Sequence, residues 1–223
     1  MTKALIKEYQ KSLDPAEKYH FEGACHKALC FINKYDQYFT NKSILDYACG
    51  MGYTSYVFSL YCSSVDSFDA NPNCEFVFKF NNKESNKLRW QDFDQITHNH
   101  YDTVFIYSLH HGLKNPIQWF EWFVNRLSFN TFIYGDAEKT STWATAEDKK
   151  RRIIEGKSYN YDYSLDGYST ISIDEVIPKV PNLRVIERDD TMQFSHQPNS
   201  THDPYKMLVN EPKKIVYICE KIK

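Results

Sequence analysis

The sequence contains little glycine and no long apolar segment. Only 7 of its 223 residues are glycine. No apolar stretch approaches the ~20 residues that a membrane-spanning helix needs. Residues 1–15 also lack the continuous apolar segment of a secretory signal peptide. We therefore expect a cytoplasmic protein that makes no contact with a membrane.

An excess of positive charge and a paired-cysteine motif are also absent. The net charge is −2 and the sequence pI is about 6.4, whereas nucleic-acid-binding domains usually carry a basic patch. The 6 cysteines are scattered and form no C-x-x-C pair, which favours buried thiols in a reducing compartment. We expect no nucleic-acid partner, and the oligomeric state stays open.

Apolar residues are plentiful instead, and they are grouped into short segments. Hydrophobic residues make up 42% of the chain and aromatic residues 16%, enough for the core of one domain. Strands are expected at 43–48, 64–70, 87–93, 102–108, 131–136, 183–189 and 214–220. Helical patterns at 53–62, from 72 into the 80s, from 116 and from 172 separate most of these strands.

This alternation predicts an α/β fold. We expect a Rossmann-like, open, mainly parallel seven-stranded sheet with helices on both faces. No obvious helix separates the last two strands, so the last strand is expected to be antiparallel. One domain is expected over residues 1–223. It includes an N-terminal helical segment over 1–40 and a polar, tyrosine-rich insertion over 137–170, where we expect substrate contacts.

Two of the few glycines lie close together in "ILDYACGMGYTS", residues 44–55. Ligands of an open parallel sheet bind beyond the carboxyl ends of its strands, and small residues there let a ligand approach the backbone. Asp69 follows Gly50 by 19 residues, close to the ~20-residue spacing of nucleoside-binding units. Gly50, Gly52 and Asp69 therefore predict a nucleoside site.

Three segments together resemble the class I S-adenosylmethionine-dependent methyltransferases: "LDYACGMG", "DSFDANP" and "DTVFIYSLHHGLKNP". The resemblance covers about residues 43–136, and the later strands agree only in pattern. The family's loop usually reads acidic-x-Gly-x-Gly-x-Gly, and Ala48 stands here in place of the first glycine. The resemblance implies that the chain binds S-adenosyl-L-methionine and transfers its methyl group.

The resemblance also implies roles for individual residues. Residues 1–40 would form a helical lid over the cofactor. The family's adenine-side acidic residue corresponds to Asp92, in "WQDF". The residues expected to bind the cofactor are Asp46, Ala48, Gly50, Gly52, Asp69, Ala70, Asp92, Phe93, Ser108 and, from the lid, Tyr19.

A catalytic base is expected at His110 or His111. The histidine pKa lies nearest to neutral pH, and only these two of the 8 histidines follow a core strand. His111 is the first choice. The alternative is a histidine that only packs or hydrogen-bonds in the loop. Substrate contacts are expected at Asp136, Tyr163 and His196, each of which also suits a purely structural role. The spacing of His196 and His202 with Asp203 would suit a metal, but the sequence places no other ligand nearby, so a surface loop is preferred and no metal is expected.

Several functions remain open at this point. The leading prediction is methyl transfer to an oxygen of a small-molecule or saccharide-like acceptor. The alternatives are an N-methyl or aminopropyl transferase, or a non-catalytic protein that binds a nucleoside or a partner. A nicotinamide cofactor is a minor alternative, because Ser55 stands where a dinucleotide fingerprint needs its third glycine.

Overall fold

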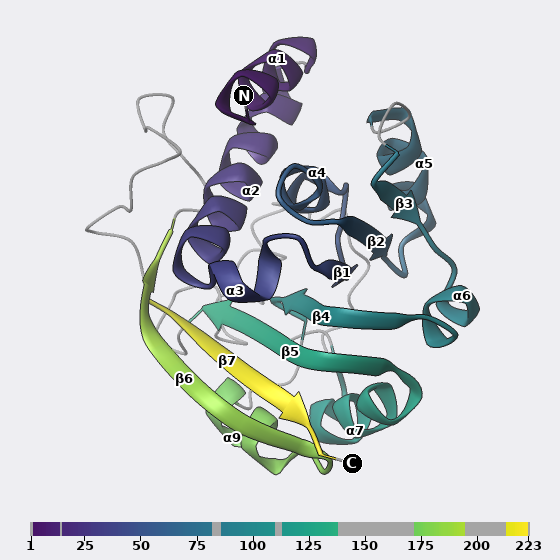
Figure 1. Cartoon of the computed structure of the whole chain (residues 1–223), viewed down its shortest axis with the longest axis vertical. Helices are drawn as coiled ribbons and strands as arrows, with labels where there is room; N and C mark the ends of the chain where they lie inside the picture. Colours follow the sequence, from purple (N-terminus) through teal and green to yellow (C-terminus); the bar gives the residue numbers. More distant parts are fainter. Residues whose placement is uncertain are drawn as a thin grey trace, which may run out of the picture.

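The centre of the computed structural model is a seven-stranded sheet with the order β3-β2-β1-β4-β5-β7-β6 (Figure 1). The structure describes residues 2–13, 15–81, 86–109, 113–137, 172–194 and 213–222. Its strands are β1 (Ser43–Tyr47), β2 (Ser64–Phe68), β3 (Leu88–Trp90), β4 (His100–Tyr107), β5 (Ser128–Ala137), β6 (Leu183–Gln193) and β7 (Lys213–Lys221). The first five pair in parallel, and β7 runs antiparallel to both β5 and β6. The predicted fold class is confirmed.

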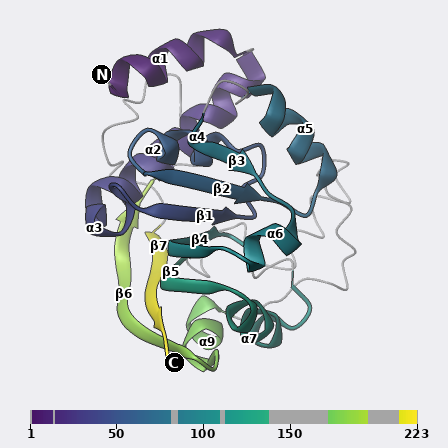
Figure 2. The same cartoon turned by 45° about the vertical axis from the view of Figure 1, so that its right-hand side comes forward.

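Helices pack on both faces of this sheet (Figure 2). One face carries α1 (Thr2–Ser12), α2 (Pro15–Lys34), α3 (Asp36–Phe39), α4 (Tyr53–Ser59) and α5 (Pro72–Asn81). The other carries α6 (Phe93–Thr97), α7 (Pro116–Arg126), α9 (Ile173–Val176) and the short 3₁₀ helix η3 (Ile177–Lys179). No helix in the described ranges combines the length and the apolar character needed to cross a membrane.

The sequence explains where these layers begin and how they pack. Pro15, Pro72 and Pro116 occupy the first residue of α2, α5 and α7, because proline fixes a helical φ and needs no backbone donor there. Neighbouring strand residues point to opposite faces. Ile44 therefore joins the core beneath α2 and α4, while Leu45 joins the core beneath α7 and α9.

The structure corrects the prediction around the third strand. The strand expected over 87–93 ends at Trp90, and Phe93 begins α6. Asp92 is the N-cap of α6, and its N–H donates to Oε1 of Gln95 at 2.9 Å. A helix of this length gives no readable apolar period. The predicted insertion lies almost wholly outside the described residues, and the division into domain, lid and insertion stays a prediction.

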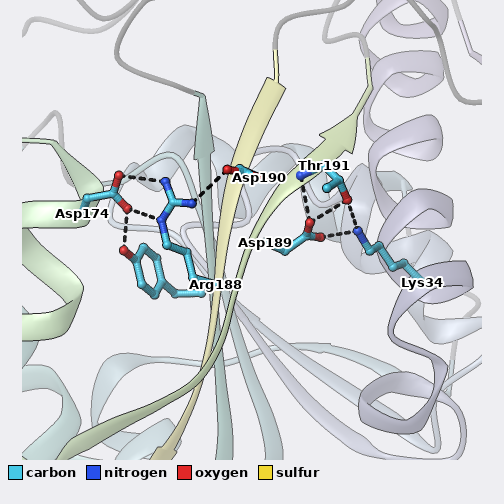
Figure 3. Close-up of polar contacts among 7 residues, drawn as sticks. Lys34, Asp174, Arg188, Asp189, Asp190 and Thr191 are labelled. Atoms are coloured by element: carbon cyan, nitrogen blue, oxygen red, sulfur yellow. Dashed lines mark hydrogen bonds and ion pairs between the residues drawn. The ribbon is translucent and has the colours of Figure 1, made fainter.

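Strand β6 ties the two helical layers together at the far end of the sheet (Figure 3). Arg188 Nε and Nη2 donate to the Asp174 carboxylate of α9 at 2.8 and 2.9 Å. The adjacent Asp189 accepts from Lys34 Nζ at 2.5 Å and from the Tyr35 hydroxyl, at the end of α2. Thr191 donates to Asp189 from its N–H at 2.8 Å and from its hydroxyl at 2.7 Å. Consecutive residues of one strand thus hold helices on opposite faces.

Candidate functional site

The loop between β1 and α4 turns through three residues with left-handed backbone. The φ angles are +59° at Ala48, +57° at Gly50 and +80° at Gly52. A Cβ on Gly52 would lie 2.2 Å from Cδ2 of Phe78 on α5, so this position needs glycine for packing as well as for its backbone. A Cβ on Gly50 would meet no atom within 4 Å. Gly52 therefore closes the loop onto α5, while Gly50 leaves one side of the loop open.

Backbone N–H groups of this loop bond directly to the end of β2. The Cys49 N–H donates to the Phe68 carbonyl at 3.0 Å. The Gly50 N–H donates to Oδ2 of Asp69 at 2.9 Å, and the Asn71 N–H donates to Oδ1 at the same distance. Because each carboxylate oxygen can accept a further hydrogen bond, Asp69 can anchor the loop and still accept ligand hydroxyls.

Asp46, at the end of β1, is buried beneath the loop. Its exposed fraction is 3%, and the Ser55 hydroxyl donates to its Oδ2 at 2.5 Å. Burial raises the pKa of Asp46 to about 6, although the Ser55 hydrogen bond and the charge of Lys27 lower it and that of Asp69 raises it further. The site therefore holds a carboxylate whose pKa lies close to neutral.

The ends of β4 and β5 bring two more predicted residues together. Ser108 has a φ of +61°, and its hydroxyl donates to Oδ1 of Asp136 at 3.2 Å. The Tyr134 hydroxyl donates to Oδ2 of Asp136 at 3.4 Å and accepts from the Leu109 N–H at 3.1 Å. Asp136 is 1% exposed, so a polar cluster lies where β4 and β5 end.

The residues after β3 have clear structural roles. Asp92 is exposed and begins α6. The Phe93 ring stacks on Trp122 of α7 with centroids 5.1 Å apart. As the N-cap of α6, Asp92 has a structural role in the turn after β3. Its predicted place beside adenine, and that of Phe93, stay predictions.

Other predicted residues are placed only in part. Ala70 follows Asp69 and is exposed. Tyr19 lies within α2, where the structure describes its backbone and not its side chain. His110, His111, Tyr163 and His196 lie outside the described residues. Within the described ranges, no group of three histidine, cysteine or acidic side chains could hold a metal ion.

The structure adds a residue that the sequence did not indicate. Lys27 of α2 is half-buried, and its Nζ lies 4.8 Å from the centroid of the Tyr107 ring at the end of β4. Burial lowers the pKa of Lys27, opposed by Asp46 and Cys49. The sequence held no signal for this position, because the lysine sits among ordinary helix-forming residues.

No protein-family model and no curated protein matches the sequence. Solved structures do match. The N-methyltransferase NodS from Bradyrhizobium japonicum WM9, crystallised with S-adenosyl-L-homocysteine, gives a TM-score of 0.56 at 14% identity, over 100% of this chain and 99% of that chain. YcgJ from Bacillus subtilis gives a TM-score of 0.57 at 14% identity, over 89% of this chain and 99% of that chain.

The chain has the class I S-adenosylmethionine-dependent methyltransferase fold. The resemblance drawn from the three segments within residues 43–136 is thereby confirmed at the level of the fold. A putative RNA methyltransferase from Pyrococcus horikoshii also matches, with a TM-score of 0.50 at 15% identity over 90% of this chain and 85% of that chain. Proteins with different acceptors therefore share this methyltransferase fold, and the fold does not identify the acceptor.

Proposed function

We propose that the protein is an S-adenosylmethionine-dependent methyltransferase that methylates an oxygen of a small-molecule or saccharide-like acceptor. The observation that carries this proposal is the 2.9 Å hydrogen bond from the Gly50 N–H to Asp69. It places an acidic acceptor of hydrogen bonds against the backbone of the glycine loop. That combination suits the ribose of a nucleoside cofactor.

The residues present fit this cofactor. Gly50 leaves room against the backbone, and Asp69 retains lone pairs for two neighbouring ribose hydroxyls. When bound, S-adenosylmethionine supplies an electrophilic methyl group on a sulfonium. The chain's contribution is then to hold both reactants in line and to keep water out.

The acceptor side is proposed to lie at the ends of β4 and β5. Ser108 and Asp136 meet there, and His110 and His111 follow Ser108 closely in the sequence. One of these histidines would take the proton of an acceptor hydroxyl. Asp136 would orient the acceptor, and Tyr163 and His196 would add further contacts.

Methylation of an amine is the second candidate, favoured by the buried carboxylate of Asp136. A carboxylate in a dry site attracts a cationic amine more strongly than a neutral hydroxyl. The two candidates differ in their response to Asp136→Asn. An amine acceptor would lose affinity, shown by a raised KM, whereas a hydroxyl acceptor activated by histidine would keep most of it.

Calorimetry with S-adenosylmethionine and S-adenosylhomocysteine tests the cofactor directly. We expect both to bind the folded protein at one site. Mass spectrometry of ligands that co-purify with the protein then identifies acceptor candidates. A folded sample that binds neither compound would overturn the proposed function.

The histidines are tested once an acceptor is known. Replacing the catalytic histidine, His111 or His110, with alanine should lower kcat by roughly 10²–10⁴-fold and leave cofactor affinity nearly intact. The rate of the parent should rise with pH through the histidine pKa, and the variant should lose that dependence. Full activity in both single variants and in the double variant would assign the proton transfer to another group.

A further inference from the structure

Lys27 occupies an unusual position for a lysine on an amphipathic helix. The neighbouring residues Cys25, His26 and Ala28 are buried against the rest of the fold. Lys27 itself is half-buried, with its ammonium over the Tyr107 ring rather than in open solvent. This ring is held in place by close contact with Gly135, where an added Cβ would come within 3.0 Å of it.

The ammonium of Lys27 is incompletely satisfied. It has three donors, yet among the described residues no oxygen acceptor lies within hydrogen-bond distance of Nζ. Contact with an aromatic face replaces only part of the lost hydration. Asp46 is the buried carboxylate whose charge acts on Lys27, and it already accepts the Ser55 hydroxyl.

The position of Lys27 relative to the glycine loop identifies the ligand group. The strand order β2-β1-β4 places Asp69 on one side of β1 and Tyr107 on the other. Lys27 thus lies on the β4 side of the loop, away from the proposed ribose contact. S-adenosylmethionine carries one negative group, the carboxylate of its methionine part, at the end of the molecule opposite the adenine.

We infer that Lys27 binds the α-carboxylate of the methionine moiety of S-adenosylmethionine. This assignment rests on the proposed function and adds a residue to it. Lys27 and Asp46 then present opposite charges to the two ends of a zwitterion, an ammonium for its carboxylate and a carboxylate for its amine. Charge-assisted pairs of this kind are strong when water is largely excluded.

Decarboxylated S-adenosylmethionine provides the matched ligand, because it keeps the sulfonium and the amine and lacks only the carboxylate. Calorimetry should show that the wild type binds S-adenosylmethionine roughly 10- to 100-fold more tightly than the decarboxylated compound. Lys27→Met should bind the two ligands about equally, by losing affinity for the first alone. Lys27→Arg should retain part of the discrimination. Lys34→Met, a loss of lysine on the same helix, should retain all of it.

Each other outcome overturns the assignment in a recognisable way. An equal loss for both ligands in Lys27→Met would mean that the residue only supports the fold. Unchanged affinity for both, with a loss confined to an acidic acceptor, would assign Lys27 to the acceptor. If Lys27→Met does not fold, Lys27→Arg and the wild-type preference between the two ligands still decide. A wild type that binds neither ligand would instead reject the proposed function and the assignment with it.

Discussion

Asp46 and Asp189 are both buried aspartates, with exposed fractions of 3% and 6%, yet their pKa values move in opposite directions. Burial raises both. Asp46 accepts one hydroxyl, and its pKa rises to about 6. At Asp189, donors on Lys34, Tyr35 and Thr191 outweigh burial and bring the pKa down to about 2. The fold supplies several hydrogen-bond donors to Asp189, which joins β6 to α2. Asp46, beneath the glycine loop, receives only one from the residues that the structure describes and can accept more.

This difference separates a carboxylate that the fold itself satisfies from one that, in the proposed function, a ligand would help to satisfy. A buried carboxylate is costly unless its lone pairs are used. At Asp189 of β6, the chain itself supplies the hydrogen-bond donors, from Thr191 and Lys34 (Figure 3). At Asp46, beneath the glycine loop, a bound ligand would supply the missing donors. The two regions should therefore respond separately to substitution.

Removing the Asp189 carboxylate should give the largest change in stability. Asp189→Ala leaves the Tyr35 hydroxyl and the Thr191 N–H without their acceptor and should lower the free energy of unfolding by about 3 kcal/mol. Lys34 is 34% exposed, so its ammonium stays hydrated and limits the loss. Urea denaturation measures this change. Affinity for S-adenosylhomocysteine should stay within about 2-fold; a larger drop would mean that the two regions are coupled.

Removing the Asp69 carboxylate should lower cofactor affinity rather than stability. Asp69→Ala should weaken cofactor binding by ~1.5–3 kcal/mol, since charge-assisted hydrogen bonds to the ribose are lost. Calorimetry measures this, with Asp190→Asn as the control, because Asp190 is an exposed partner of Arg188 at the far end. Unchanged affinity would place the ribose elsewhere.

Acid should remove the stability that the Asp189 carboxylate contributes, over a defined pH range. The pKa of Asp189 falls from 3.8 to about 2 on folding, so its stabilisation is complete above pH 4 and is lost as the pH falls through about 2. Linkage converts this shift into about 2 kcal/mol. The stability gap between the wild type and Asp189→Ala should shrink by that amount between pH 5 and pH 2. A gap that stays constant with pH would contradict the low pKa.

The smallest expected effect concerns strain in the glycine loop. Ala48 has a φ of +59°, which costs an L-residue roughly 1–2 kcal/mol. Ala48→Gly relieves this strain, but it adds entropy to the unfolded chain, so the net gain in stability should be about 0.5 kcal/mol. Ala28→Gly within α2 is the control and should destabilise by at least about 1 kcal/mol. Equal losses in both variants would show that Ala48 is unstrained.

Local patterns in the sequence were sufficient to predict most of the fold. Apolar segments indicated the strands, helical patterns indicated the starts of α5 and α7 at Pro72 and Pro116, and the Gly50–Asp69 spacing indicated two residues that prove to be hydrogen-bonded. These signals are short-range or depend on a known separation. The five-residue α6 was too short to leave such a pattern.

The remaining features depend on contacts between distant segments. Tyr35 and Asp189 are 154 residues apart, and Ser108 and Asp136 are 28 apart. Lys27 could not be distinguished from the other lysines, because its burial arises only when α2 packs beside Tyr107. The residues next to Lys27 in the sequence do not indicate its contact with Tyr107.

Helix α2 carries Lys27 and Lys34 on one face, two helical turns apart. Inserting or deleting one residue between them would rotate one lysine by about 100° relative to the other. Either the contact with Tyr107 or the ion pair with Asp189 would then be lost. A change of length in this stretch of the chain would therefore break one of the two contacts even if every side chain were kept. Length variation among natural relatives is expected to stop at its borders.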